Sequence, residues 1–161
     1  MTKPPLLTPH EAWTISIGAA AYMLSQAHHV DYVHRGNDML PIIRGGKDRV
    51  SLTPYFHRLR TGDIVLANVS RSYVLLRILE IRGDRIVLLG DALPVENKVE
   101  CSMSDILGRV NYIRRGRVGF HPKGGNLWMS LLPLRKSLMR VYKVVRKSNL
   151  DTIEEGAYAD E

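Results

Sequence analysis

The stretch YVLLRILEIRGDRIVLL, residues 73–89, decides the fold. Its two apolar runs, Tyr73 to Ile81 and Arg85 to Leu89, flank the turn Arg82-Gly83-Asp84. A Gly-Asp pair at a tight reversal between two apolar runs is typical of a β-hairpin. The sequence therefore predicts two antiparallel strands joined at this turn.

Further short β-rich segments lie on both sides of the hairpin. Strands are expected at Val30–His34, Arg49–Leu52, Ile64–Val69 and, as the final strand, Ile106–Ile113. Pro94–Lys98 has the composition of a loop. Five to seven short strands without intervening helices indicate a mainly β fold, a coiled antiparallel sheet or small barrel.

A helix is expected at each end of this β region. Thr8 as N-cap, Pro9 at the first helical position and Glu11 in a capping box predict a helix that runs to about Ala27. Its apolar residues recur at helical spacing, which predicts one packed face: Trp13, Ile17, Ala20, Ala21 and Leu24. Leu127–Lys147 is amphipathic and predicts a second helix.

These patterns divide the chain into four parts. We expect an N-terminal helical extension at 1–28, a β domain at 29–115, a basic amphipathic helical extension at 116–147 and an acidic, disordered tail at 148–161. A chain of 161 residues suits one domain with extensions.

The net charge of +7 is concentrated in the C-terminal third. From Arg109 to Lys147 there are eleven Lys or Arg and no Asp or Glu. Such a segment can contact nucleic acid, anionic lipid or an acidic protein face, and it can equally be a solvated surface. The residues expected to make an anionic contact are Arg135, Lys136, Arg140 and Lys143.

The single cysteine, Cys101, excludes an internal disulfide framework and a cysteine-based zinc site. The longest apolar run, Trp13 to Leu24, is shorter than the roughly 18 to 20 residues of a membrane span. These features predict a cytoplasmic protein, with contact to a membrane surface left open.

The segment Gly36-Asn37-Asp38-Met39-Leu40-Pro41 predicts a compact turn directly after the first strand. Gly36 allows an unusual backbone angle, and Asn37 and Asp38 are turn formers. Such a turn presents its central residue at the mouth of a site, and that residue is Asp38.

Five segments resemble, in order and rough spacing, those of the signal-peptidase and LexA-like serine peptidases. The turn at 36–41 resembles their G-[DN]-S-M-x-P segment. The other four are Arg60-Thr61-Gly62-Asp63-Ile64-Val65, Tyr73-Val74-Leu75-Leu76-Arg77-Ile78, Gly83–Asp91 and Asp105-Ile106-Leu107-Gly108-Arg109-Val110. Together they cover about half the chain.

The resemblance implies a coiled, mostly antiparallel β structure to which a substrate peptide adds as an extra strand. It implies hydrolysis by a serine nucleophile that a lysine or histidine base activates, because a serine hydroxyl is otherwise a poor nucleophile. The turn residues Asn37, Met39 and Pro41 would contact the bound peptide. No cofactor and no metal are implied.

Two of the three positions that handle protons in the family are substituted in this chain. Asp38 stands at the nucleophile position and Leu76 at the general-base position, while Asp91 matches the acid that would orient a histidine base. Losing such groups removes about four to six orders of magnitude in rate. Classical serine peptidase activity is not expected.

Other residues could still give the chain catalytic activity. Asp38 and Asp91 can be considered as an aspartic dyad that shares a proton. Displaced nucleophiles can be sought among Ser70, Ser72, Ser102 and Cys101. The histidines show no recognisable ligand spacing, but His34 precedes Asp38 by only four residues and is a candidate partner for it.

Three hypotheses follow from the sequence. The first is an inactive peptidase homologue that binds an extended peptide by strand addition. The second is an active endopeptidase with a rearranged catalytic centre. The third is a nucleic-acid or membrane-surface binding protein that uses the basic C-terminal helix.

Overall fold

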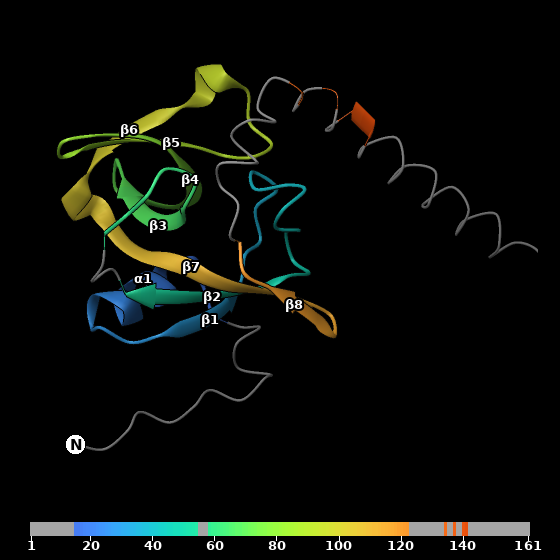
Figure 1. The fold of residues 1–161 in the computed structure, drawn as a ribbon. Coiled ribbons are helices and arrows are strands. Elements are labelled where there is room, and N and C mark those ends of the chain that lie inside the picture. Colours follow the sequence, from blue (N-terminus) through green and yellow to red (C-terminus); the bar gives the residue numbers. More distant parts are fainter. Residues whose placement is uncertain (1–14, 55–57, 123–133, 135–136, 138–139, 142–161) are drawn as a thin grey trace, which may run out of the picture.

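The computed structural model describes residues 15–54 and 58–122, together with the single positions Leu134, Ser137, Arg140 and Val141. The predicted capping box at Thr8–Glu11 lies outside the described residues, as does most of Leu127–Lys147. The described part is built around one antiparallel sheet that curls into a half-barrel, with one α-helix against it (Figure 1).

Seven strands form the continuous path of the sheet, in the order β1-β2-β7-β3-β4-β5-β6, and an eighth strand pairs with β7. Every pairing is antiparallel. The strands are β1 (Val30–Val33), β2 (Arg49–Pro54), β3 (Ile64–Val69), β4 (Ser72–Arg82), β5 (Arg85–Leu89), β6 (Val99–Ser102), β7 (Ile106–Arg115) and β8 (Val118–Phe120).

The predicted hairpin is confirmed, because β4 and β5 pair across Gly83, whose φ is +60°. The prediction that the strand beginning at Ile106 is the final one is wrong, since β8 follows it. The sequence analysis also missed β6, which pairs with β5 just after a short 3-10 helix at Val95–Asn97. Both missed strands are short, at four and three residues, and carry little alternation of apolar and polar residues.

The helix α1 (Ile17–Ser25) is shorter than predicted. Its N-cap is Ser16, which has an extended backbone and whose Oγ accepts a hydrogen bond from the Ala19 amide at 3.1 Å. A continuous helix from Pro9 to Ala27 is therefore wrong. The predicted packed face is confirmed at Ala20, Ala21 and Leu24, which are buried against the sheet.

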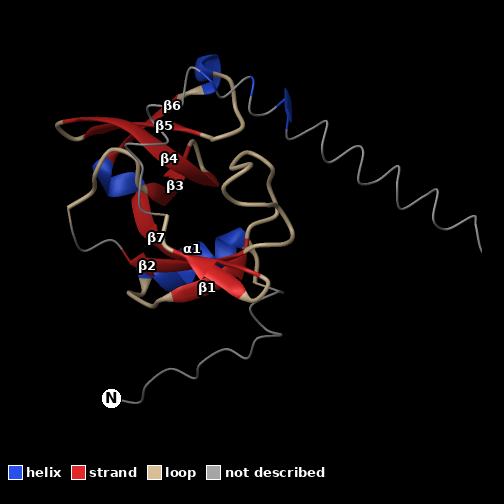
Figure 2. Cartoon of the chain, turned by 45° about the vertical axis from the view of Figure 1, so that its right-hand side comes forward, coloured by secondary structure: helices blue, strands red, loops and turns tan. Residues whose placement is uncertain are grey.

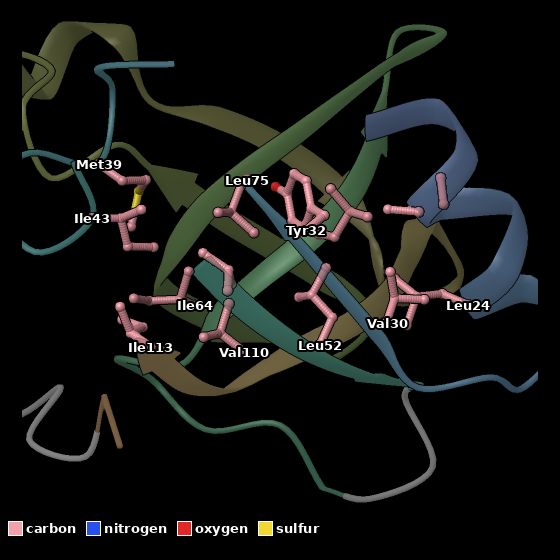
Figure 3. Packing of buried hydrophobic residues seen from close by; sticks show 14 residues of the cluster. Leu24, Val30, Tyr32, Met39, Ile43, Leu52, Ile64, Leu75, Val110 and Ile113 are labelled. Atoms are coloured by element: carbon pink, nitrogen blue, oxygen red, sulfur yellow. The ribbon is translucent and has the colours of Figure 1, made fainter. Parts of the chain in front are cut away.

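The two faces of the central strands bury two separate clusters of apolar side chains. Ile64 and Leu66 of β3 belong to the first cluster, whereas the alternating residues Val65 and Ala67 belong to the second. This is the alternation expected of a strand that is covered on both faces. Figure 3 shows the first cluster, which extends from Leu24 of α1 to Met39 and Ile43.

The loop between β1 and β2 positions the turn of interest. It lies beside the sheet, coloured cyan in Figure 1 and tan in Figure 2. Met39 and Ile43 from this loop are fully buried in the first cluster, so hydrophobic burial holds the loop against the sheet.

In the part of the chain that the structure describes, none of the helices has both the length and the apolar character needed to cross a bilayer.

Candidate functional site

A chain of three side chains links β1 to the turn that carries Asp38. The Tyr32 hydroxyl lies 3.3 Å from Nδ1 of His34, and Nε2 of His34 lies 2.9 Å from Oδ1 of Asp38. Burial raises the pKa of Tyr32 well above its usual value, and the negative charge of Asp38 raises it further. The phenol therefore stays protonated, and because a carboxylate only accepts, Nε2 of His34 is the ring nitrogen that donates to Asp38.

Gly36 makes room for this chain. A Cβ atom at position 36 would collide with Oδ1 of Asp38 and would lie 2.7 Å from Nε2 of His34. Gly36 is not among the glycines with a positive φ, so the turn does not use the unusual backbone angle that glycine allows. The requirement for glycine here is close approach of two side chains.

Two further glycines lie close to the backbone of the turn. A Cβ at Gly45 would lie 2.8 Å from the Arg35 carbonyl oxygen, and one at Gly90 would lie 2.6 Å from the Asp38 carbonyl oxygen. The Ala92 amide donates to that same Asp38 carbonyl at 2.8 Å. The turn and the Gly90-Asp91 segment, which are far apart in sequence, are thus in backbone contact.

The carboxylate of Asp91 is held by an arginine. Its two oxygens accept hydrogen bonds from Nε and Nη2 of Arg77, both at 2.7 Å, and Nη1 of Arg77 donates to the Gly62 carbonyl at 2.7 Å. Both side chains are buried, with 3% and 2% exposure. This bidentate pair joins three of the five segments that carry the resemblance.

Leu76 lies on the other face of β4 from its neighbours. It is buried in the second cluster with Val65 and Ile78, whereas Leu75 packs in the first cluster with Met39. No residue of the turn at 36–41 belongs to the second cluster. An aliphatic side chain in this apolar setting can neither take nor deliver a proton.

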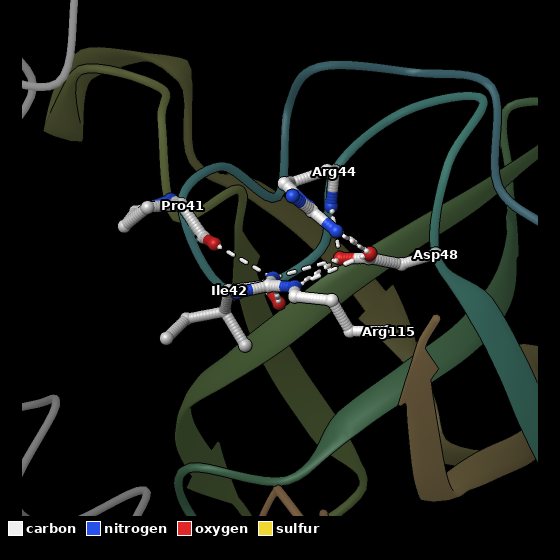
Figure 4. Close-up of polar contacts among 5 residues, drawn as sticks. All are labelled: Pro41, Ile42, Arg44, Asp48 and Arg115. Carbon is white, nitrogen blue, oxygen red and sulfur yellow. Dashed lines mark hydrogen bonds and ion pairs between the residues drawn. The ribbon is translucent and has the colours of Figure 1, made fainter. Parts of the chain in front are cut away.

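A second charged cluster fixes the loop behind the turn (Figure 4). Asp48 is fully buried and binds both Arg44 and Arg115, with shortest contacts of 2.9 and 2.7 Å. Nη2 of Arg115 also donates to the carbonyls of Pro41 and Ile42, at 3.3 and 3.0 Å. Burial by itself raises the pKa of Asp48, but the hydrogen bonds from Arg115 and Arg44 outweigh it and hold that pKa below its usual value.

A groove runs beside β1 towards the turn. It has a volume of about 400 Å³ and is mostly apolar, with walls formed by Ile15, Ser16, Ile17, Tyr32, Val33, His34, Arg35 and Gly36. In the described chain, β1 pairs only with β2, and Tyr32 and Val33 of β1 line this groove. Asp38 does not line the groove, but its Oδ1 contacts His34, which does.

The predicted peptide-contacting residues differ in accessibility. Asn37 is exposed and Pro41, which follows a cis peptide bond, is half-buried. Met39 is fully buried, so its side chain shapes the turn from within the core and has no surface to offer a peptide in this structure.

Three of the residues considered for an alternative catalytic centre, Asp38, Asp91 and Ser102, have structural partners of their own. Oδ1 of Asp38 accepts from His34 and both oxygens of Asp91 bind Arg77, so the two carboxylates are not paired with each other. Ser102 donates to Asp84 at 2.6 Å and caps a short 3-10 helix, Met103–Asp105.

Cys101 is a poor candidate nucleophile. It lines an open, charged pocket of about 500 Å³ beside β5 and β6, away from the turn. Burial, together with the nearby charge of Asp105, raises the pKa of Cys101 to about 11, so little thiolate is present at neutral pH.

The described residues give little evidence on metal binding or on the basic extension. Among them, no three His, Cys, Asp or Glu side chains are grouped as a metal site requires. Arg140 is exposed, while Arg135, Lys136 and Lys143 lie outside the described residues. The anionic contact proposed for this segment stays a prediction.

No protein-family model matches the chain, and a search of curated proteins finds no match to it.

Sequence reasoning singled out Asp38 and His34, but it missed Tyr32. A signal for Tyr32 was present, because residues two apart in an extended segment share one face. It also missed the roles of Asp48 and Arg115, which lie 67 residues apart and meet only through the pairing of β2 with β7.

Proposed function

We propose that the chain is a degenerate homologue of the signal-peptidase and LexA-like serine peptidases that binds an extended peptide by strand addition and does not hydrolyse it. Five segments in the family's order support this relationship, and the curled antiparallel sheet is the kind of fold that the resemblance implies. The close approach of Gly90 to the Asp38 carbonyl agrees with it, since it brings two of those segments together.

The observation that carries the proposal is that β1 has no second strand partner among the described residues, while its Tyr32 and Val33 line a mostly apolar groove of about 400 Å³. An edge strand presents unpaired N–H and C=O groups, to which an extended peptide can bind as a further strand. Neighbouring pockets then receive its alternate side chains. The edge leads directly to the Asp38 turn, where the resemblance would place the reacting residue.

The same site supports inactivity. A carboxylate replaces the hydroxyl nucleophile at position 38, and the base position holds the buried Leu76. His34 is the imidazole nearest to Asp38 in the described site, but Tyr32 and Asp38 occupy its two ring nitrogens. It therefore has no nitrogen free to activate a water molecule or a hydroxyl group.

The test is binding of a positional-scanning library of N-acetylated, C-amidated octapeptides to the full chain, measured by fluorescence anisotropy. We expect binding by a subset of the library. N-methylation of alternate backbone amides in a bound peptide should weaken binding at least about tenfold, because each methyl group removes a donor from the ladder.

Two controls make this outcome decisive. N-methylation of the intervening amides should have a smaller effect, because these point away from β1. Binding that no N-methyl group weakens would contradict strand addition, and cleavage of a bound peptide, detected by mass spectrometry, would contradict the inactive site.

A further inference from the structure

One of the two carboxylate oxygens of Asp38 has no hydrogen-bond donor among the described residues. Oδ1 accepts from Nε2 of His34, and the structure gives Oδ2 no partner among the described residues. The side chain is 25% exposed, so this oxygen remains within reach of a ligand.

The cations around the site do not neutralise this charge. Arg44 and Arg115 bind Asp48, and Arg77 binds Asp91. Arg35 lines the groove but forms no ion pair with Asp38. The donor that Asp38 does have, Nε2 of His34, contacts Oδ1 at 2.9 Å and leaves Oδ2 for a ligand.

The groove and Asp38 together match one kind of side chain. The groove wall is apolar at Ile15, Ile17 and Val33, and beyond His34 and Gly36 lies the carboxylate. Lysine and arginine combine an aliphatic stem, which packs on apolar surface, with a cationic head that seeks a carboxylate. A small or purely aliphatic side chain would leave the charge of Asp38 uncompensated beside it.

We propose that the peptide bound along β1 carries a lysine or arginine whose cationic head binds Oδ2 of Asp38. This inference rests on the proposed function and deepens it by naming the class of peptide. The substitution that removes the nucleophile thereby gives the site a new specificity, because a serine hydroxyl at position 38 would carry no charge to select a cation.

The experiment uses the same octapeptide library with lysine, arginine, norleucine or citrulline fixed at each position in turn. Norleucine and citrulline keep the length of the basic side chains without their charge. At low ionic strength we expect one position at which lysine or arginine binds about fivefold more tightly than its neutral counterpart, the size expected of a half-exposed ion pair. About 0.5 M salt should reduce the preference.

Two variants separate the local effect from the general field of a chain with a net charge of +7. Asp38→Asn keeps the size of the side chain and an acceptor for His34, and it should abolish the preference. Glu96→Gln removes the same charge from an exposed residue of the 3-10 helix Val95–Asn97, which neither belongs to β1 nor lines the groove, and it should leave the preference unchanged.

The outcomes distinguish the two proposals. Binding without a preference for basic residues, or a preference that survives in Asp38→Asn, would overturn this inference and leave strand addition standing. A preference lost equally in Glu96→Gln would overturn it too, since only the overall field would then be acting. Failure of every library peptide to bind would overturn the proposed function and this inference together.

Discussion

Breaking the buried pair of Arg77 and Asp91 should destabilise the chain strongly, whereas replacing both residues should not. Arg77→Met leaves a carboxylate with 2% exposure without its two hydrogen bonds of 2.7 Å. Asp91→Leu leaves the guanidinium buried with the Gly62 carbonyl as the partner that remains from this network. Removing one member of a buried ion pair costs about 3–5 kcal/mol.

The double variant Arg77→Met/Asp91→Leu buries no unpaired charge. Among the contacts described above, it loses the donor to the Gly62 carbonyl, and an orphaned buried acceptor costs about 1–3 kcal/mol. We therefore expect the double variant to be more stable than either single variant. The coupling energy, the sum of the two single losses minus the double loss, should be several kcal/mol.

The free energies of unfolding are measured by urea denaturation of the full chain, followed by far-UV circular dichroism. A typical domain is stable by about 5–15 kcal/mol, so the single variants should show a large fall in midpoint. A double variant whose loss equals the sum of the single losses would refute the reasoning, because Arg77 and Asp91 would then not stabilise each other.

Two further predictions concern the turn and the loop behind it. Gly36→Ala should cost about 1–3 kcal/mol, the usual penalty of overpacking, because its Cβ collides with Asp38 and His34. Asp48→Asn should reduce the fall in the free energy of unfolding that occurs as the pH is lowered into the acid range. The folded-state pKa of Asp48 is lowered, so its contribution is present above the unfolded value of about 3.9 and is lost as the pH falls through the lower folded value.

Matched measurements check both predictions. Gly18→Ala is the control for Gly36→Ala, since a Cβ at Gly18 meets no atom closer than 3.9 Å and the change should stabilise α1 by up to about 1 kcal/mol. Equal effects of the two alanines in urea denaturation would contradict the collision at Gly36. For Asp48, unfolding at a series of pH values from about 6 to 2 is compared between the two proteins, and parallel profiles would show that Asp48 does not cause this fall.

Local sequence patterns were sufficient to predict the long central strands. The hairpin of β4 and β5 was predictable because its turn chemistry and its apolar runs agree with each other. The start of α1 was not, because apolar residues at helical spacing already begin at Trp13, before the Ser16 N-cap, and a short helix is stabilised mainly by packing, here of Ala20 and Leu24 against the sheet. β6 and β8 were missed because each obtains its partner from a neighbouring strand and has little pattern of its own.

The candidate site divides in the same way. The sequence alone determined that position 38 holds an aspartate without a hydroxyl, that position 76 holds a leucine without an ionisable group, and that His34 is only four residues from Asp38. Side-chain identity and short separation settle such matters without a fold.

Only the tertiary structure decided which groups the remaining side chains meet. Asp91 pairs with Arg77 and not with a group at position 76, because adjacent residues of a strand point to opposite faces of the sheet. The turn is held by Gly90 and Arg115, which are more than 50 residues distant in sequence. Such contacts depend on strand order and register, which are set by the burial of both sheet faces and leave no local mark in the sequence.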